Sequence, residues 1–227
     1  MPPAEEIEQR LHRIRERIAD AARRAHRDSA SIRLVVASKT QTPDAILAAY
    51  GAGAREFGEN YVQEAVSKRA RLNDLTDVQW HLIGHLQSNK ARLAATAFTM
   101  IQSVDSESIA RALGRVRPAM PVLIEINSGG ETTKTGVAPD QAERLVDTIR
   151  AVVDVRGLMA IPPAGDNPET SRLQFAQLRE LRDRLATATG LALSELSMGM
   201  TDDFEIAIEE GATIVRVGRA IFGERIT

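Results

Sequence analysis

Short apolar segments alternate with helix-forming segments along most of the chain, and this alternation limits the possible fold more than any other feature. Short runs rich in small and β-branched residues are typical of buried strands. We predict strands at 33–38, 55–57, 78–82, 97–102, 121–126, 155–160, 193–196 and 213–217. We predict helices at 43–52, 60–71, 87–94, 106–114, 139–151, 168–188 and 202–210, with a short helix or turn at 219–224.

Strands that are separated by helices pair in parallel through right-handed crossovers. Eight such repeats that close on themselves form an α/β barrel of the TIM type, (β/α)8. An open doubly wound sheet is the alternative, but it more often carries G-x-G-x-x-G after its first strand, and this sequence has no such turn. We therefore predict a single barrel domain over residues 1–227.

An amphipathic helix is predicted ahead of the first strand, over residues 5–27. Its apolar residues recur at helical spacing, and arginine and glutamate fill the other face. An arginine-rich face can bind nucleic acid, but the interspersed acidic residues favour a solvated surface. We expect residues 1–28 to form an extra N-terminal helix that packs on the barrel.

Charge and composition exclude several classes of protein. The 227 residues carry a formal net charge of −2, which does not indicate a nucleic-acid or membrane partner. The absence of cysteine excludes disulfides, thiolate metal sites and a cysteine nucleophile. The N-terminal segment has no apolar core of the signal-peptide type, and no apolar run is long enough to span a membrane. We expect a cytoplasmic protein.

A lysine, Lys39, follows the first predicted strand. The alternation of strand side chains places Lys39 on the same face as Val35 and Ala37. A lysine at a strand end is commonly a solvated charge. The alternative is an amine held in a pocket at lowered pKa, ready to form a Schiff base with an aldehyde, because the carboxyl ends of barrel strands carry the ligand sites.

The segment Ser-Met-Gly-Met-Thr at 197–201 joins the seventh predicted strand to a helix. Hydroxyls, a glycine and the free N–H groups of a first helical turn suit a phosphate, and barrel phosphate sites lie after strands seven and eight. Gly218, after the eighth strand, can add backbone donors. The competing interpretation is that Thr201 is only an N-cap, and Asp202 and Asp203 favour it because they would repel an anion.

An arginine, Arg216, lies between two valines in the last predicted strand, on the same face as Ile214. A buried arginine needs a partner. Strands one and eight are neighbours in a closed barrel, so Lys39 and Arg216 can face one pocket. An inward lysine, an inward arginine and a phosphate-binding loop together suit pyridoxal phosphate.

Two histidines, His81 and His85, have a spacing that a zinc site can use. No acidic residue lies between them, and Gly84 argues against one continuous helix, so H-E-x-x-H chemistry is not predicted. Structural or pocket-lining roles are favoured.

Several segments resemble one known family. They are VASKT at 36–40, FGENYVQE at 57–64, WHLIGHLQSNK at 80–90, GLMAIP at 157–162, SMGMTDDF at 197–204 and VRVGRAIFG at 215–223. In this order they resemble the pyridoxal-phosphate homeostasis proteins, the YggS/PROSC type, which are related to the barrel domain of alanine racemase.

The resemblance implies an alanine-racemase-like barrel without the second β-domain. It implies that Lys39 carries pyridoxal phosphate as a Schiff base and that Arg216 faces the pyridine nitrogen. Asn60 and Met159 match pocket residues of the family. The phosphate-binding segments are matched by Ser197, Met198, Gly199, Met200, Thr201 and Gly218. Family members bind the cofactor and influence its supply, with no established reaction.

Two departures and two alternatives accompany this expectation. Arg219 stands where members often have threonine or serine, so it either strengthens phosphate binding or fills the phosphate's space. His85 stands where many have proline.

The alternative functions are a racemase-like pyridoxal-phosphate enzyme and an aldolase-like barrel that uses Lys39 on a sugar phosphate. We expect a monomer that has pyridoxal phosphate as its ligand and apo forms of pyridoxal-phosphate enzymes as candidate recipients.

Overall fold

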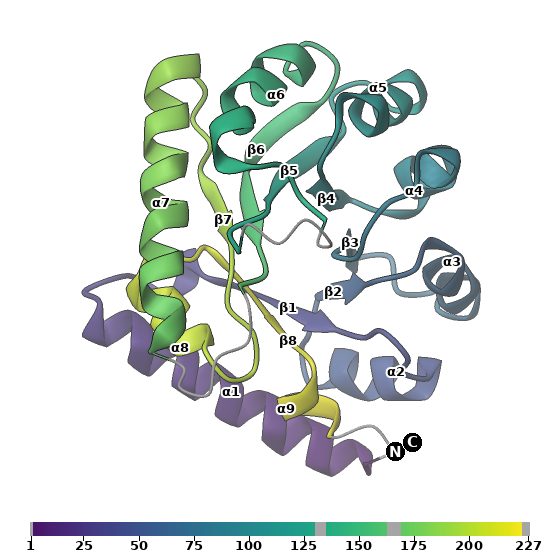
Figure 1. Cartoon of the computed structure of the whole chain (residues 1–227). Coiled ribbons are helices and arrows are strands. Elements are labelled where there is room, and N and C mark those ends of the chain that lie inside the picture. The colour runs from purple at the N-terminus through teal and green to yellow at the C-terminus, as the bar shows by residue number, and fades with distance from the viewer. Residues whose placement is uncertain (1, 130–134, 163–168, 224–227) are drawn as a thin grey trace.

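Eight parallel strands form a closed barrel in the computed structural model, which describes residues 2–129, 135–162 and 169–223 (Figure 1). Each strand pairs with the next in chain order, and the first pairs with the last. The predicted TIM-type barrel is thereby confirmed. The strands are β1 (Arg33–Ala37), β2 (Glu56–Glu59), β3 (Gln79–Leu82), β4 (Met100–Val104), β5 (Pro121–Ile126), β6 (Asp154–Ala160), β7 (Glu195–Ser197) and β8 (Ile214–Val217).

Helices surround the strands (Figure 1). They are α1 (Ala4–Arg24), α2 (Pro43–Gly51), α3 (Val62–Arg71), α4 (Ala91–Ala97), α5 (Glu107–Val116), α6 (Ala142–Ile149), α7 (Thr170–Thr189), α8 (Phe204–Glu209) and α9 (Arg219–Phe222). Short 3₁₀ turns lie at Ser29–Ser31, Ser88–Lys90 and Pro139–Gln141. We predicted that α7 begins at residue 168 and that α9 ends at residue 224. Both of these positions lie outside the described residues. No helix in the described part of the chain has both the length and the apolar character needed to cross a bilayer.

Two predicted boundaries were wrong for identifiable reasons. The strand predicted at 97–102 is β4, Met100–Val104, because the alanines before it continue α4 to Ala97. The helix predicted over 5–27 ends at Arg24, and His26 just beyond it has a positive φ of 53°, which a helix cannot contain. Other element ends differ by a few residues, as helix and strand termini commonly do.

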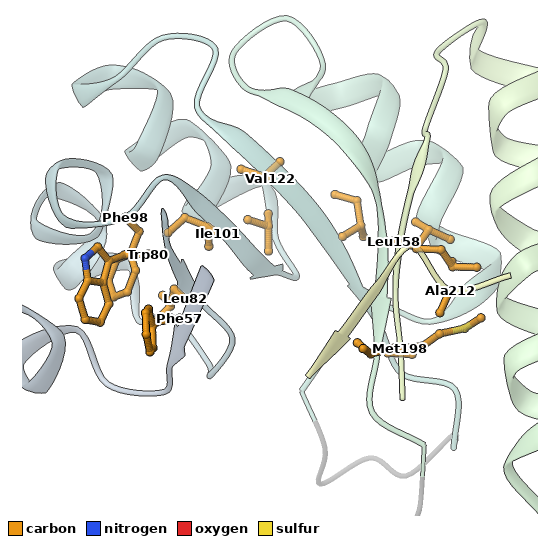
Figure 2. Close-up of a cluster of buried hydrophobic side chains, with 14 of the residues drawn as sticks. Phe57, Trp80, Leu82, Phe98, Ile101, Val122, Leu158, Met198 and Ala212 are labelled. Carbon is orange, nitrogen blue, oxygen red and sulfur yellow. The ribbon is translucent and has the colours of Figure 1, made fainter. Parts of the chain in front are cut away.

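The larger part of the core lies between the barrel and its helices. Figure 2 shows members of this layer, including Phe57, Trp80 and Leu82, which are nearly or fully buried. The rings of Phe57 and Trp80 lie 5.7 Å apart between centroids. Burying one large apolar side chain contributes about 1.5–3 kcal/mol, so this layer fixes the helices on the outside of the barrel.

The barrel interior holds a smaller apolar cluster. Its members are Val35, Met100, Leu123, Met159 and Ile214. Val35 therefore points inward, as the alternation predicted for this strand requires. β1 ends at Ala37, so Lys39 lies in the turn that follows the strand. Ile214 also points inward, as does Arg216 two residues along β8.

Helix α1 lies along the barrel beside α2, α8 and α9 (Figure 1). Its apolar face is buried, with Ile7 and Leu11 at 0% exposure. Arg17 makes two 3.1 Å hydrogen bonds to the carboxylate of Glu205 on α8. The N-terminal helix therefore supports the two short helices that follow strands β7 and β8.

Candidate functional site

A pocket of about 560 Å³ opens at the carboxyl ends of the strands. Six residues of the predicted site line it, and they come from β1, β2, β7 and β8 or the loops that follow them. These six are Lys39, Asn60, Met200, Thr201, Arg216 and Gly218. A larger, more open hollow of about 820 Å³ over α5 contains none of the predicted site residues, so we assign the site to the first pocket.

Four predicted site residues lie behind the pocket rather than on its wall. Met159 belongs to the apolar cluster inside the barrel. Met198 points outward into the core layer between barrel and helices, where Figure 2 shows it. Ser197 is fully buried, and its hydroxyl contacts Arg216. Gly199 is buried beneath α8, so the structure brings six of the ten predicted residues together at the cavity surface.

The segment that carries Lys39 is held on both sides of that residue. The Nζ of Lys68 donates to the carbonyl of Ser38 at 2.7 Å. The N–H of Thr40 donates to the Oε1 of Glu64 at 2.7 Å. Thr40 has a positive φ of 65°, an unfavourable conformation for a β-branched residue. The hydrogen bond to Glu64 helps to hold this turn, which directs the chain from β1 to α2.

Lys68, Glu59 and Glu64 form an ion cluster under this segment. Lys68 Nζ lies 2.8 Å from Glu59 Oε1 and 2.6 Å from Glu64 Oε1. Ser38 Oγ also donates to Glu59 Oε1, at 2.6 Å. Burial raises the pKa of the fully buried Glu59, while hydrogen bonds from Lys68 and Ser38 oppose that rise. Sequence reasoning missed this cluster, although a charged residue at 68 within the apolar face of α3 was a visible signal.

Arg216 is 3% exposed and projects from β8 toward the pocket. Its Nη1 donates to Ser197 Oγ at 2.5 Å, and its Nη2 donates to the carbonyl of Ala160 at 2.9 Å. Burial lowers the pKa of Arg216 to about 10, and the carboxylates of Asp203 and Glu125 oppose this fall. The guanidinium is therefore positively charged at neutral pH, with a fixed orientation and N–H groups left for a ligand.

The loop after β7 turns sharply at Gly199, which has a φ of 88°. A Cβ at this position would lie 2.5 Å from the Cβ of Ala207, so only glycine lets the loop pack on α8. Asp203 Oδ1 accepts the N–H of Met200 at 2.8 Å. Within the described residues the N–H groups of Thr201 and Asp202 have no acceptor, and both residues line the pocket.

Gly218 and Arg219 line the same pocket as Thr201 and Asp202. A Cβ on Gly218 would lie 2.9 Å from the carbonyl oxygen of Ala37, so the ends of β8 and β1 approach closely here. Arg219 forms an ion pair with Asp202. The cation at position 219 is thus neutralised by an aspartate of the neighbouring loop, and both side chains remain more than half exposed.

The two histidines have separate surroundings. His81 is 2% exposed inside the barrel, and its Nε2 lies 3.1 Å from Glu56 Oε2. His85 lies 3.5 Å from Asp105 at the surface. Within the described residues no three potential metal ligands gather. A structural or pocket-lining role was predicted for both histidines, and neither is among the described residues that line the pocket.

Asn60 extends into the pocket with its Oδ1 buried and unpartnered. A Cβ on Gly84 would lie 2.5 Å from the Asn60 carbonyl, so the glycine in the loop after β3 permits this approach. An orphaned buried acceptor inside a pocket is typical of a position that binds a ligand donor.

The fold and pocket define a barrel of the alanine racemase class. The family model described as "Alanine racemase, N-terminal domain" matches residues 9–226. An alanine racemase from Corynebacterium glutamicum has the same fold, with a TM-score of 0.73 at 18% identity, covering 98% of this chain and 62% of the racemase. The predicted alanine-racemase-like barrel is confirmed at the level of fold.

Closer relatives identify the family. A "Pyridoxal phosphate homeostasis protein" of Aquifex aeolicus is 45% identical over 223 residues, covering 96% of this chain and 97% of the relative. The structure of PipY from Synechococcus elongatus with pyridoxal phosphate bound is 38% identical, with a TM-score of 0.84, covering 96% of this chain and 100% of PipY. The chain belongs to the pyridoxal phosphate homeostasis protein family, as the sequence motifs predicted.

Proposed function

We propose that this protein binds pyridoxal phosphate through a Schiff base on Lys39 and takes part in storing, buffering or handing over the cofactor in the cytoplasm. The observation that carries the proposal is the convergence of Lys39, Arg216 and the backbone at Thr201 on one pocket. The cofactor supplies an aldehyde for a lysine amine, a ring nitrogen and a phosphate dianion. The three groups of the protein match these three parts.

The groups on the pocket wall fit the cofactor chemically. The free N–H groups of Thr201 and Asp202 suit phosphate oxygens. The buried Oδ1 of Asn60 accepts a hydrogen bond from a ligand hydroxyl or ammonium. Arg216 presents a fixed cation that donates to an unprotonated ring nitrogen. PipY, from the same family, binds pyridoxal phosphate, which supports this assignment.

A binding role without catalysis agrees with the residues that face the pocket. Moving a proton on both faces of an amino acid's α-carbon needs a second acid–base group opposite the lysine. Tyr61 is 63% exposed, and the hydroxyl of Tyr50 donates to Oδ1 of Asp77 at 2.7 Å. Among the described residues, the pocket wall includes neither tyrosine nor histidine, and its aspartate, Asp202, forms an ion pair with Arg219.

Borohydride reduction followed by peptide mapping tests the lysine assignment. Reduction should fix the pyridoxyl mass on the peptide that contains Lys39, and Lys39→Ala should abolish the visible absorption band while the fold survives. Lys90→Ala is the matched control, because Lys90 lies outside this pocket and should leave the band unchanged. Label found on Lys90 or on Lys134, which lies outside the described residues, would reject the assignment.

Two further measurements separate the alternatives. Pyridoxal without its phosphate should bind much more weakly than pyridoxal phosphate, and equal affinities would remove the phosphate site from the proposal. Deuterium exchange at the α-carbon of alanine should stay at the level of a Lys39→Ala control. Sustained exchange that depends on Lys39 would instead place the protein among racemase-like enzymes.

A further inference from the structure

A chain of buried polar side chains crosses the barrel interior beneath the pocket. Arg216 Nη1 contacts Ser197 Oγ at 2.5 Å, and Ser197 Oγ lies 2.6 Å from Gln102 Oε1. Gln102 Nε2 lies 3.0 Å from His81 Nδ1. His81 Nε2 lies 3.1 Å from Glu56 Oε2, close to the opposite end of the barrel.

The hydrogen bonds of this chain all run in one direction. Arg216 has only donors, so the Ser197 oxygen accepts and its hydroxyl hydrogen goes to the oxygen of Gln102. The amide nitrogen of Gln102 then donates to Nδ1 of His81. This bond places the histidine proton on Nε2, which faces the carboxylate of Glu56.

The opposite orientation of the Gln102 amide is disfavoured by its neighbours. A flipped amide would place its nitrogen on Ser197, whose hydroxyl hydrogen would then lack an acceptor among the described residues. It would also require the proton of a neutral His81 on Nδ1, which would leave a bare Nε2 lone pair 3.1 Å from the carboxylate of Glu56. The observed order satisfies Arg216, Ser197 and Gln102, while His81 Nε2 and Glu56 Oε2 lie close together without the geometry of a hydrogen bond.

We infer that Gln102 and His81 are positioning residues for Arg216, and that through it they orient the pyridine end of the cofactor; this rests on the proposed function. Gln102 and Ser197 are 0% exposed and His81 is 2% exposed, so the chain works without competition from water. Polar groups in a barrel interior are costly unless they are fully paired. A purely apolar filling would pack this space but would let the guanidinium rotate.

Each link constrains the next. Ser197 holds one guanidinium nitrogen, and the Ala160 carbonyl holds the other. The Ser197 hydroxyl presents a lone pair to Arg216 only while its own hydrogen is bound by Gln102. His81 fixes the amide plane of Gln102 in the same way. Removing any link allows Arg216 to lose the orientation that a ring nitrogen requires.

The first test uses the apo protein and is independent of cofactor binding. Nitrogen-15 spectra should show His81 as the neutral tautomer protonated on Nε2, and the guanidinium protons of Arg216 should exchange slowly with water. Gln102→Met keeps the side-chain length but removes the amide, so the Arg216 protons should exchange faster. Gln79→Met is the control, since Gln79 is an exposed glutamine on β3.

The second test compares pyridoxal phosphate with its 1-deaza analogue, in which carbon replaces the ring nitrogen. The parent should prefer pyridoxal phosphate by roughly tenfold or more, the effect of one hydrogen bond to a charged group. Gln102→Met and His81→Leu should reduce the preference to within about threefold, as expected when that bond becomes weak. His81→Asn, whose carbonyl can accept from Gln102, should retain most of it.

The outcomes distinguish this inference from the proposed function. If the unsubstituted protein does not carry pyridoxal phosphate on Lys39, the proposed function is refuted. The role of the hydrogen-bonded side chains in orienting the cofactor is then refuted as well. A parent that binds both ligands equally leaves Lys39 in place but overturns the inference. The inference is also overturned if the preference survives in Gln102→Met and His81→Leu. If Gln102→Met does not fold, the contrast between His81→Leu and His81→Asn decides.

Discussion

Replacing Lys68 by methionine should destabilise the protein by leaving a carboxylate buried without its cation. Lys68 has a side chain only 7% exposed, and its partner Glu59 is 0% exposed. Removing one member of such a buried pair costs about 3–5 kcal/mol. For a chain of this length, about 3 kcal/mol corresponds to a fall in Tm of about 6–12 °C. Methionine matches the lysine stem closely, so packing contributes little to this loss.

The loss should depend on pH in a defined direction. Burial already raises the pKa of Glu59, and without the opposing hydrogen bond from Lys68 the pKa rises further. A group whose pKa is raised by folding adds stability at pH below its unfolded value, about 4.3 for glutamate, and loses that contribution as pH rises through the folded value. Lys68→Met should therefore be more destabilising at about pH 8 than at about pH 5.

Urea unfolding followed by circular dichroism at both pH values measures this effect. The double variant Lys68→Met/Glu59→Gln has neither charge of the buried pair, so no carboxylate is left without its cation. Most of the stability lost in Lys68→Met should therefore be recovered in the double variant, especially at the higher pH. Arg111→Met is the matched control, because its ion pair with Glu107 is about half exposed. It should cost less than about 1 kcal/mol. An equal loss at both pH values, or no recovery in the double variant, would refute this explanation.

Three further changes have definite expected results. Gly199→Ala should destabilise by about 1–3 kcal/mol in thermal melts, because its Cβ would lie 2.5 Å from that of Ala207 at a φ of 88°. Unchanged stability would show that the loop adapts. Leu11→Ala should cost about 2–5 kcal/mol if α1 is part of the cooperative unit, whereas a separate early transition would contradict this. Thr40→Gly should gain up to about 1 kcal/mol from relief of its left-handed conformation, measured by chemical denaturation, and a clear loss would disprove strain at this residue.

The barrel could be predicted from the sequence because its strands repeat a simple pattern. Eight apolar runs separated by helix-length segments have few alternative folds, and alternation within β1 and β8 correctly placed Val35 and Ile214 inside. The start of β4 was misplaced because Phe98 and the alanines before it suit either a strand or a helix.

The wall of the pocket was predicted less completely than its position. The inward side chain of Arg216 follows from strand alternation, whereas Lys39 reaches the pocket from the turn after β1. The outward side chain of Met198 and the inward hydroxyl of Ser197 depend on where β7 ends. Sequence analysis also missed Gln102 and Lys68. Gln102 pairs with His81, 21 residues away on β3, and Lys68 on α3 pairs with Glu59, 9 residues away on β2. Single-sequence periodicity shows neither pair, although the spacing of Glu64 and Lys68 is helical.

The pairing of β1 with β8 has a consequence for synthesis of the protein on the ribosome. The pocket needs Lys39 from the beginning of the chain and Gly218 from near its end, and Leu34 lies opposite Val215 in the closing pair of strands. Helix α1 likewise docks on α8 and α9, which are translated after the first seven strands. Domains fold as they emerge, but these contacts cannot form until the chain as far as Gly218 has left the exit tunnel. Nascent chains that have emerged only as far as β7 therefore lack a complete pocket and cannot withdraw a ligand from the free pool.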